Sequence, residues 1–287
     1  MRFAVLQTLN GLSLSAVLFL ISIGFNIIIG LMRIINLSHA TLFVLAAHIG
    51  VEVLGRTGSF LAAIVAGGLS AALIGVIIER FLIVRMYGRR FEQVLMTMGI
   101  MFIVDDITLM IWGGYAVRTP APAILSGPIT ILGVIYPLYR FAMIGFGVIA
   151  AVLMWLLIDR TKFGAYIRAG ADNSEMIQAM GINVRKVFLL SFGLGALLVG
   201  LAGVLSSPLY ALQPGMSMNF LSLAIVVITI GGIGSLPGVM VGSLFVGLID
   251  SFGKAFFPEL SYFTMFVPMV LVLVIRPQGL LGRLGWS

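Results

Sequence analysis

Long apolar runs, separated by short clusters of charge, make up most of the sequence. The longest covers residues 187–249 without any Asp, Glu, Lys or Arg, and another uncharged run covers residues 3–32. One helical crossing of a bilayer takes about 20 apolar residues, so the longer run holds at least two crossings and has room for three. A transmembrane barrel would instead show alternating segments of roughly 10 residues. The pattern therefore predicts an all-α, polytopic bundle of membrane helices.

Charges and Gly or Pro breaks divide the chain into candidate spans. They lie at 10–32, 37–54, 60–79, 93–117, 140–158, 187–207, 219–233, 236–253 and 260–275. Segments 37–54 and 219–233 are short and lie beside a break, so each is a candidate half-helix. We expect about eight to ten spanning or half-spanning helices in one membrane domain covering residues 1–287. Pro and Gly exclude a regular helix at 118–139, where we expect an external loop with a short hairpin around Ser126 and Gly127.

Composition and charge agree with a membrane protein. The chain is 61% hydrophobic and 9% charged, against about 25% charged residues in soluble domains. Its net charge of +7 comes mainly from loops between spans, which is typical of loops retained in the cytoplasm. Even numbers of spans separate three basic clusters, so all three fall on one side; the side of the N-terminus stays open. The clusters are Arg80, Arg85, Arg89 and Arg90; Arg160, Lys162, Arg168, Arg185 and Lys186; and Arg276 and Arg283.

Residue counts argue against several kinds of chemistry. With no cysteine and 2 histidines, the chain lacks a thiolate and is poor in metal ligands, and we expect no enzymatic activity. A phosphate-binding loop needs four residues between its first glycine and a Gly-Lys-Ser/Thr end. Here five residues separate Gly247 from Gly253, and Ala255 follows Lys254. We therefore expect no cofactor in this chain, and ATP hydrolysis only in partner subunits.

The charged stretch 159–186 is the part most exposed to water. Asp172 is predicted to cap a short helix, Glu175 to complete a capping box three residues later, and Gly181 to end the helix. Between them lie four apolar residues, Met176, Ile177, Ala179 and Met180. A short capped helix of this kind is suited to docking in a groove of a cytoplasmic partner. The alternative is an ordinary surface loop that satisfies the positive-inside rule.

Three motifs carry a family resemblance. The first is the charged loop, with Glu175 six residues before Gly181 and with Thr161-Lys162-Phe163-Gly164, Arg168-Ala169 and Ala179-Met180-Gly181-Ile182 around them. The others are Ile35-Asn36-Leu37-Ser38-His39-Ala40 and Gly231-Gly232-Ile233-Gly234-Ser235-Leu236-Pro237-Gly238. Together the motifs resemble ABC importer permeases of the branched-chain amino acid type (LivH/LivM), closest to the LivH-like branch. Met176 and Ile177 replace two alanines of the family's coupling helix, and Leu37, Ser38 and Ala40 replace Phe, Ala and Gly.

The resemblance implies a function and a set of partners. It implies the permease subunit of an ATP-driven importer in the bacterial inner membrane, working with a second, LivM-like permease, two cytoplasmic ATP-binding subunits and a periplasmic solute-binding protein. The residues expected to couple it to the ATPase are Asp172, Glu175, Ala179, Gly181 and Ile182. Branched-chain or related amino acids are the expected substrates, and urea or short amides are an alternative, because an uncharged pathway suits all of these solutes.

Glycines recur through 193–242 and have two interpretations. Small residues let helices approach closely in lipid, and Gly234, Gly238 and Gly242 would share one helix face, so packing is favoured. The alternative is that segment 231–235 breaks a helix and exposes backbone groups to a translocation path. The residues concerned are Gly231, Gly232, Gly234, Ser235 and Gly238.

Two further clusters hold polar residues inside apolar segments. Asn36, Ser38 and His39 lie at a predicted helix break, where they either contact substrate or, as we slightly favour for His39, hydrogen-bond the backbone. Asp105 and Asp106 lie in span 93–117, where an ionised Asp costs roughly 2.5–3.5 kcal/mol at a helix centre. Adjacent helical positions diverge by about 100°, so at most one of the two carboxylates faces any single partner. This pair is the only support for an ion-coupled secondary transporter.

Overall fold

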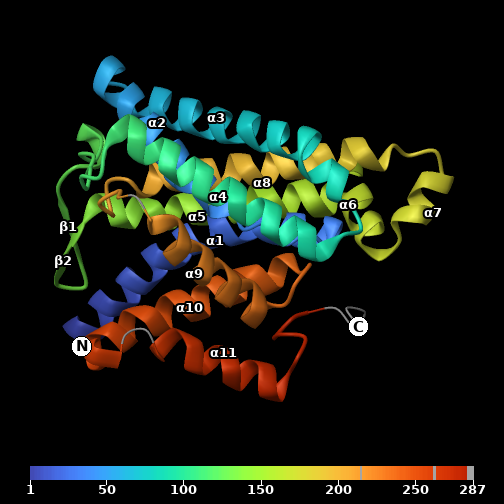
Figure 1. Cartoon of the computed structure of the whole chain (residues 1–287). Coiled ribbons are helices and arrows are strands. Elements are labelled where there is room, and N and C mark those ends of the chain that lie inside the picture. Colours follow the sequence, from blue (N-terminus) through green and yellow to red (C-terminus); the bar gives the residue numbers. More distant parts are fainter. Residues whose placement is uncertain (214, 261–262, 283–287) are drawn as a thin grey trace. The chain divides into compact units, whose positions relative to one another are not determined.

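The computed structural model describes residues 1–213, 215–260 and 263–282, and most of the described chain is helical (Figure 1). The helices are α1 (Arg2–Met32), α2 (His39–Thr57), α3 (Phe60–Phe81), α4 (Arg90–Trp112), α5 (Leu138–Arg160), α6 (Lys162–Asp172), α7 (Ser174–Ala179), α8 (Val184–Ser206), α9 (Met216–Gly231), α10 (Leu236–Phe256) and α11 (Phe263–Ile275). Short 3-10 helices lie at η1 (Ile83–Met86), η2 (Ala123–Leu125) and η3 (Pro258–Leu260). A hairpin joins β1 (Pro128–Ile131) to β2 (Val134–Pro137).

Every candidate span coincides with a described helix, so the all-α, polytopic fold is confirmed. Among the described residues, 7 helices are long and apolar enough to cross a membrane, namely α1 to α5, α8 and α10. The helix α9 has 16 residues, as expected of a half-helix, whereas α2 has 19 and reaches spanning length.

The predicted end of the fourth span at 117 is wrong, because α4 ends at Trp112 and Gly113 follows with φ 78°. Arg283 of the third basic cluster lies outside the described residues.

The chain forms two compact units. The first contains residues 1–22, 120–153 and 222–287, and the second contains residues 23–119 and 154–221. Their boundaries pass through α1, α5 and α9, so each of these helices contributes to both units.

In the second unit, α2, α3 and α8 pack against one another through small residues. A methyl group added at Gly200 of α8 would lie 2.9 Å from the carbonyl oxygen of Gly67 on α3. One added at Gly203 would meet the carbonyl oxygen of Phe43 on α2. The predicted packing role of the glycines is confirmed at these two positions, because a larger residue would push the backbones apart.

In the first unit, glycines again allow backbones to meet. A methyl group added at Gly11 of α1 would lie 2.9 Å from the Cα of Leu248 on α10. One added at Gly147 of α5 would lie 3.0 Å from the Cα of Ala16 on α1. Close helix contact in this unit therefore depends on glycine as it does in the second.

The hairpin is present in the predicted loop, but its turn is not at the predicted place. Ser126 and Gly127 precede β1, and the strands pair from Pro128 with Pro137 to Ile131 with Val134. The two turn residues are Leu132 (φ 49°) and Gly133 (φ 75°). Positive φ at both central positions is the geometry that joins two strands with the correct twist, so this turn, and not Ser126-Gly127, sets the register.

Candidate functional site

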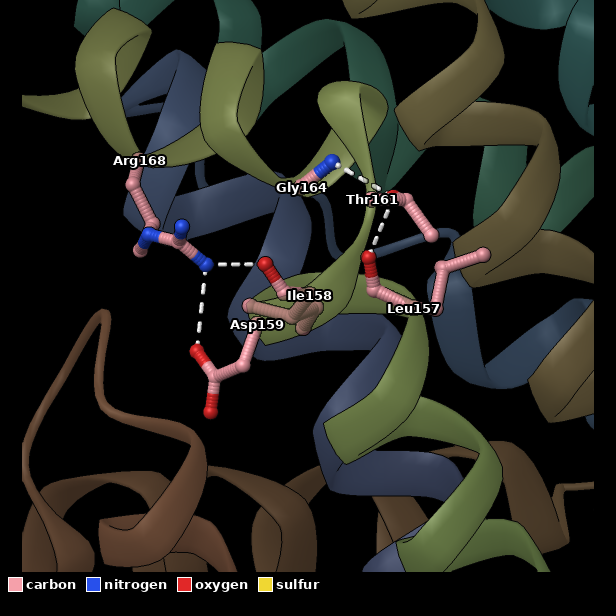
Figure 2. Close-up of polar contacts among 6 residues, drawn as sticks. All are labelled: Leu157, Ile158, Asp159, Thr161, Gly164 and Arg168. Atoms are coloured by element: carbon pink, nitrogen blue, oxygen red, sulfur yellow. Dashed lines mark hydrogen bonds and ion pairs between the residues drawn. The ribbon is translucent and has the colours of Figure 1, made fainter.

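The charged loop 159–186 begins with a tightly held turn between α5 and α6 (Figure 2). Thr161 caps α6: its Oγ1 accepts a hydrogen bond from the Gly164 N–H (3.1 Å) and donates one to the Leu157 carbonyl (2.5 Å). The side chain thus satisfies a backbone donor of one helix and an acceptor of the other. The two helices are joined in a fixed geometry.

Two further residues of the same motif stabilise the turn. The Arg168 guanidinium donates to the carbonyl of Ile158 and, at 3.1 Å, to the carboxylate of Asp159. Gly164 lies directly against that carbonyl, and a methyl group added there would be 2.5 Å from the carbonyl carbon of Ile158. The spacing of Thr161, Gly164 and Arg168 therefore has a physical cause, because all three surround the last turn of α5.

The predicted short helix exists as α7, but its cap was assigned one residue too early. Asp172 is the last residue of α6, and Asn173 caps α7, with its Oδ1 accepting from the Met176 N–H at 3.0 Å. Glu175 therefore lies in the first turn of α7 and does not complete a capping box with Asp172. Asn173 has extended dihedrals (φ −154°, ψ 99°), and this is the conformation that a capping residue needs.

The end of α7 is the one that was predicted. Gly181 has φ 80°, its N–H donates to the Gln178 carbonyl (2.9 Å), and the Ile182 N–H donates to the Ile177 carbonyl (3.2 Å). These two bonds form a Schellman motif, which favours glycine at the left-handed position. The prediction of Gly181 as the stop is confirmed.

The helix α7 presents both apolar and charged residues to solvent. Met176 and Met180 are 64% and 71% exposed, while Ile177 is 3% exposed and anchors the helix. Asp172, Glu175, Ala179 and Gly181 are exposed, and Ile182 is half-buried. Exposed methionines are adaptable contact residues, so this surface is suited to a protein partner.

Two of the basic clusters lie at the same end of the second unit, as the positive-inside rule predicted. One hollow of about 350 Å³ is lined by Arg80 from the end of α3 and by Arg185 and Lys186 from the start of α8. Behind it, the Tyr87 hydroxyl donates a hydrogen bond to the carboxylate of Glu79, which is 3% exposed. Burial raises the pKa of the Tyr87 hydroxyl, so the group stays protonated and remains a donor at neutral pH.

Sequence reasoning missed this buried pair. Glu79 is the last residue of the predicted span 60–79 and stands next to the basic cluster that begins at Arg80, so nothing in its local pattern separates it from an exposed residue. The ring of Tyr87 also contacts that of Phe188 on α8, with 5.6 Å between ring centroids. The α3–α4 connection is therefore packed against α8 close to the charged loop.

The predicted break after α1 is confirmed, and its polar residues Asn36 and Ser38 are buried although Ile35 between the helices is exposed. Asn36 and Ser38 are both 0% exposed, and Asn36 Oδ1 accepts from the Ser38 N–H (3.1 Å) and hydroxyl (2.6 Å). The Asn36 Nδ2 amide is buried without a hydrogen-bond partner among the described residues. The Leu37 N–H donates to the hydroxyl of Thr97 on α4 (3.2 Å), a contact that the sequence did not reveal.

The two histidines have different surroundings. The ring of His39 is 1% exposed and stacks on Phe25 of α1, with 5.4 Å between ring centroids. His48 lies nine residues further along α2, where its Nδ1 forms a hydrogen bond with the Val44 carbonyl (2.9 Å) and its ring contacts that of Trp112. The packing role predicted for His48 agrees with these contacts.

The glycine break between α9 and α10 is present in the first unit. Gly232 and Gly234 have φ of 105° and 79°, and Ser235 caps α10 by accepting from the Gly238 N–H (3.1 Å). Gly231 and Gly238 touch, since a methyl group on either would meet the carbonyl oxygen of the other. Gly234 lies outside the helix, so the predicted face shared by Gly234, Gly238 and Gly242 is wrong. Close packing is instead made by Gly231, Gly238 and Gly242.

The two aspartates lie well inside α4, which continues to Trp112; Asp105 is half-buried, whereas Asp106 is exposed. Asp105 accepts a hydrogen bond from the Ser217 hydroxyl at 2.7 Å. The Asp106 side chain leaves the helix about 100° away from that of Asp105, as expected for adjacent helical positions. Within the described residues, no three His, Cys, Asp or Glu side chains come together to hold a metal ion.

Seven helices of spanning length in the described part of the chain, helix breaks with buried polar residues and a charged loop with an exposed short helix define a polytopic membrane protein of the transport type. Comparison with known families identifies the family of this chain. It belongs to the family described as the permease component of the branched-chain amino acid transport system, whose model matches residues 7–274. It is thus a multi-pass protein of the inner membrane, and its resemblance to the LivH/LivM type is confirmed.

Individual relatives are similar along almost their whole length. The branched-chain amino acid permease BraD of Pseudomonas aeruginosa is 27% identical, over 96% of this chain and 95% of its own. The corresponding permease LivH of Escherichia coli is 26% identical over the same shares of the two chains. The ribose import permease RbsC of Escherichia coli is also 26% identical, over 95% of this chain and 85% of its own.

One solved structure has a similar fold. The structure of PsaBC from Streptococcus pneumoniae in complex with Fab superposes with a TM-score of 0.50, at 15% identity, over 93% of this chain and 89% of its own. At this identity the likeness concerns the fold alone.

Proposed function

We propose that this chain forms the membrane path of an ATP-driven ABC importer for branched-chain or closely related amino acids. The observation that carries the proposal is the family match over residues 7–274, together with the exposed helix α7 at the end of the second unit that holds the basic clusters. The chain itself performs no hydrolysis in this account. ATP is bound and hydrolysed by partner subunits, and this chain needs no cofactor.

The helix α7 is the proposed contact with an ATPase. Met176 and Met180 supply adaptable apolar area, and Glu175 and Asp172 supply charge beside them. The turn capped by Thr161 joins α5 to α6, and the Schellman motif at Gly181 ends α7 just before α8. A displacement of α7 by the ATPase is therefore transmitted to α5 and α8. Ala179, Gly181 and Ile182 complete the proposed coupling surface.

Two helix breaks are the proposed contacts with the substrate. In the second unit, Asn36, Ser38 and His39 place polar groups in an otherwise apolar core, and the Asn36 amide still has unused donors. In the first unit, Gly231, Gly232, Gly234, Ser235 and Gly238 interrupt the helix and leave backbone groups outside the regular ladder. Broken helices of this kind line the binding sites of many transporters.

The proposed partners are a second, LivM-like permease, two ATP-binding subunits and a periplasmic solute-binding protein. The relatives named as branched-chain amino acid permeases support amino acids as the substrate. A relative of similar identity is named as a ribose import permease, and this supports uncharged solutes such as urea or short amides as a second candidate class. A proton-coupled carrier is disfavoured, because Asp105 already pairs with Ser217.

Reconstitution tests the proposal. The complete complex is placed in liposomes with ATP inside, and the binding protein is supplied outside with labelled L-leucine, L-valine, ribose or urea. We expect uptake of the amino acids that depends on ATP and on the binding protein. Uptake of ribose or urea alone would reassign the substrate, and uptake without ATP would overturn the importer assignment.

A further inference from the structure

A cavity of about 580 Å³ opens at the end of the second unit where the charged loops meet. Its size lies within the range of small-molecule sites, roughly 300–1,000 Å³. Four segments line it: the end of α1, the connection from η1 to α4, the α6–α7 turn and the start of α8. Asp172 and Glu175 of this lining also belong to the proposed coupling surface, but none of the roles proposed above uses the cavity itself.

The walls carry charges of opposite sign. Arg90 lies on the wall formed by the start of α4, and Asp172 and Glu175 lie on the wall formed by the α6–α7 turn. The ion pairs of the described chain join Arg56 to Glu52, Arg168 to Asp159, and Lys254 to Asp250, so none involves these three residues. Arg33, directly after α1, adds a second cation to the lining, so two cations and two carboxylates face one cavity, and Arg90, Asp172 and Glu175 are outside the ion pairs named above.

The floor of the cavity is apolar. It includes Met32 from the end of α1 and Val184 and Phe188 from the start of α8, and Met32 and Val184 are 9% and 5% exposed. A free amino acid with an apolar side chain is one compact ligand that complements the Arg90 wall, the Asp172 and Glu175 wall, and the apolar floor. Its carboxylate would pair with Arg90, its ammonium with Asp172 or Glu175, and its side chain would cover the floor.

The walls are fixed before any ligand arrives. Tyr87 is held by its bond to Glu79 and by the Phe188 ring, and the Gln93 amide, 3% exposed as a residue, donates to the Met86 carbonyl at 2.7 Å. On the other wall, Asn173 is fixed as the cap of α7. A preformed site loses little binding energy to ordering, so it can hold a small ligand.

We propose that this cavity binds a free apolar amino acid from the cytoplasm and thereby slows import. A ligand that joins the start of α4 to the α6–α7 turn ties α7 to the span beside it. Because α7 is the proposed contact with the ATPase, tying it down opposes the movement that couples hydrolysis to transport. The inference rests on the proposed function, and it makes the cavity a site of inhibition by the accumulated product.

The test measures uptake into liposomes whose lumen holds ATP and a chosen solute. The lumen contains unlabelled L-leucine, L-leucinamide (no carboxylate) or 4-methylpentanoate (no ammonium), and labelled L-leucine with the binding protein is outside. We expect lumenal L-leucine to slow initial uptake, and the two analogues at equal concentration to leave it unchanged. Equal inhibition by an analogue would overturn the zwitterion assignment.

Variants locate the effect. Arg90→Gln should raise the L-leucine concentration needed for inhibition by about tenfold to a hundredfold, the loss expected for one hydrogen bond between charged groups. Arg89→Gln is the matched control, because Arg89 is exposed and is not among the residues that line the cavity. If the same L-leucine concentration inhibits uptake by both variants, the cavity is not the site of inhibition.

A second measurement does not depend on transport. Hydrogen exchange of the full complex in nanodiscs should show that L-leucine protects the amides of residues 172–180 in the wild type and the Arg89→Gln variant, and fails to protect them in Arg90→Gln. If uptake is absent from liposomes whose lumen holds ATP and no added solute, the proposed function fails, and the exchange measurement still tests whether the cavity binds L-leucine. Absence of protection in the wild type refutes the site.

Discussion

Replacing Gly164 with Ala should destabilise the start of α6, although Ala normally favours a helix. The added methyl group would lie 2.5 Å from both the carbonyl carbon and the Cα of Ile158, and nearer still to the carbonyl oxygen. These are backbone atoms, so no side-chain rotation relieves the overlap. The carbonyl of Ile158 also accepts the Arg168 bond, and its displacement weakens that contact as well.

The expected size follows from two opposing effects. Ala is better than Gly in a helix interior by up to about 1 kcal/mol, and overpacking of a close contact costs roughly 1–3 kcal/mol. The gain in helix propensity is small at Gly164, because it is only the third residue of α6 and lies outside the helix interior. The cost of the overlap is therefore larger than this gain. A net loss of about 1–2 kcal/mol corresponds to a 5- to 30-fold change in the local opening equilibrium.

Hydrogen exchange of α6 amides in nanodiscs measures this equilibrium. Gly164→Ala should speed exchange across α6 by that factor, and coupled uptake should fall with it. Gly99→Ala on α4 is the matched control, because no heavy atom lies within 4 Å of its added methyl group. Protection of α6 that is unchanged or greater in Gly164→Ala would refute the argument that this glycine is required by contact with Ile158.

Three further predictions concern other contacts. Tyr87→Phe keeps the ring and leaves the buried Glu79 carboxylate without its donor, so the thermal midpoint of the purified complex should fall by an amount equivalent to about 1–3 kcal/mol; an unchanged midpoint would contradict this. Glu175→Arg should lower uptake while ATP hydrolysis continues and membrane levels stay constant, whereas Glu92→Arg, an exposed control on α4, should behave as wild type. Gly238→Leu should abolish uptake, with loss of the complex in detergent if the glycine packs helices and an intact, inactive complex if it lines the path; normal uptake would exclude both roles.

The membrane helices could be predicted because their signal is local. Apolar length, flanking charge and Gly or Pro breaks determine where a span begins and ends, and the helix interruptions beside Asn36 and at Gly232 were found in this way. The stop at Gly181 was found for the same reason, since glycine is favoured where the backbone needs positive φ.

The sequence-based assignments were wrong where two neighbouring segments or residues had similar preferences for a cap or a turn. Asp172 and Asn173 are both good caps, and only the backbone dihedrals show that Asn173 leaves the helix. The hairpin turn was missed because Leu132 adopts φ 49°, which a leucine side chain rarely does. Sequence preference pointed to Ser126 and Gly127 instead.

Contacts between distant segments could not be predicted from one sequence. Thr97 receives the Leu37 N–H from a segment 60 positions earlier, and Ser217 reaches Asp105 across 112 positions. Each side chain is ordinary for its local pattern, and only the packing of α4 against its neighbours gives it a partner. The cavity between the start of α4 and the α6–α7 turn was missed for the same reason.

The central claim is that ATP hydrolysed by a partner drives transport through this chain. It is tested most directly by uptake of labelled L-leucine into liposomes that contain the complete complex and lumenal ATP, with the proton gradient collapsed by an uncoupler. We predict that uptake continues at its full rate, in the wild type and in Asp105→Asn and Asp106→Asn alike, because no carboxylate has to carry a proton. Uptake that stops on addition of the uncoupler while ATP is still present would contradict the account and favour an ion-coupled carrier.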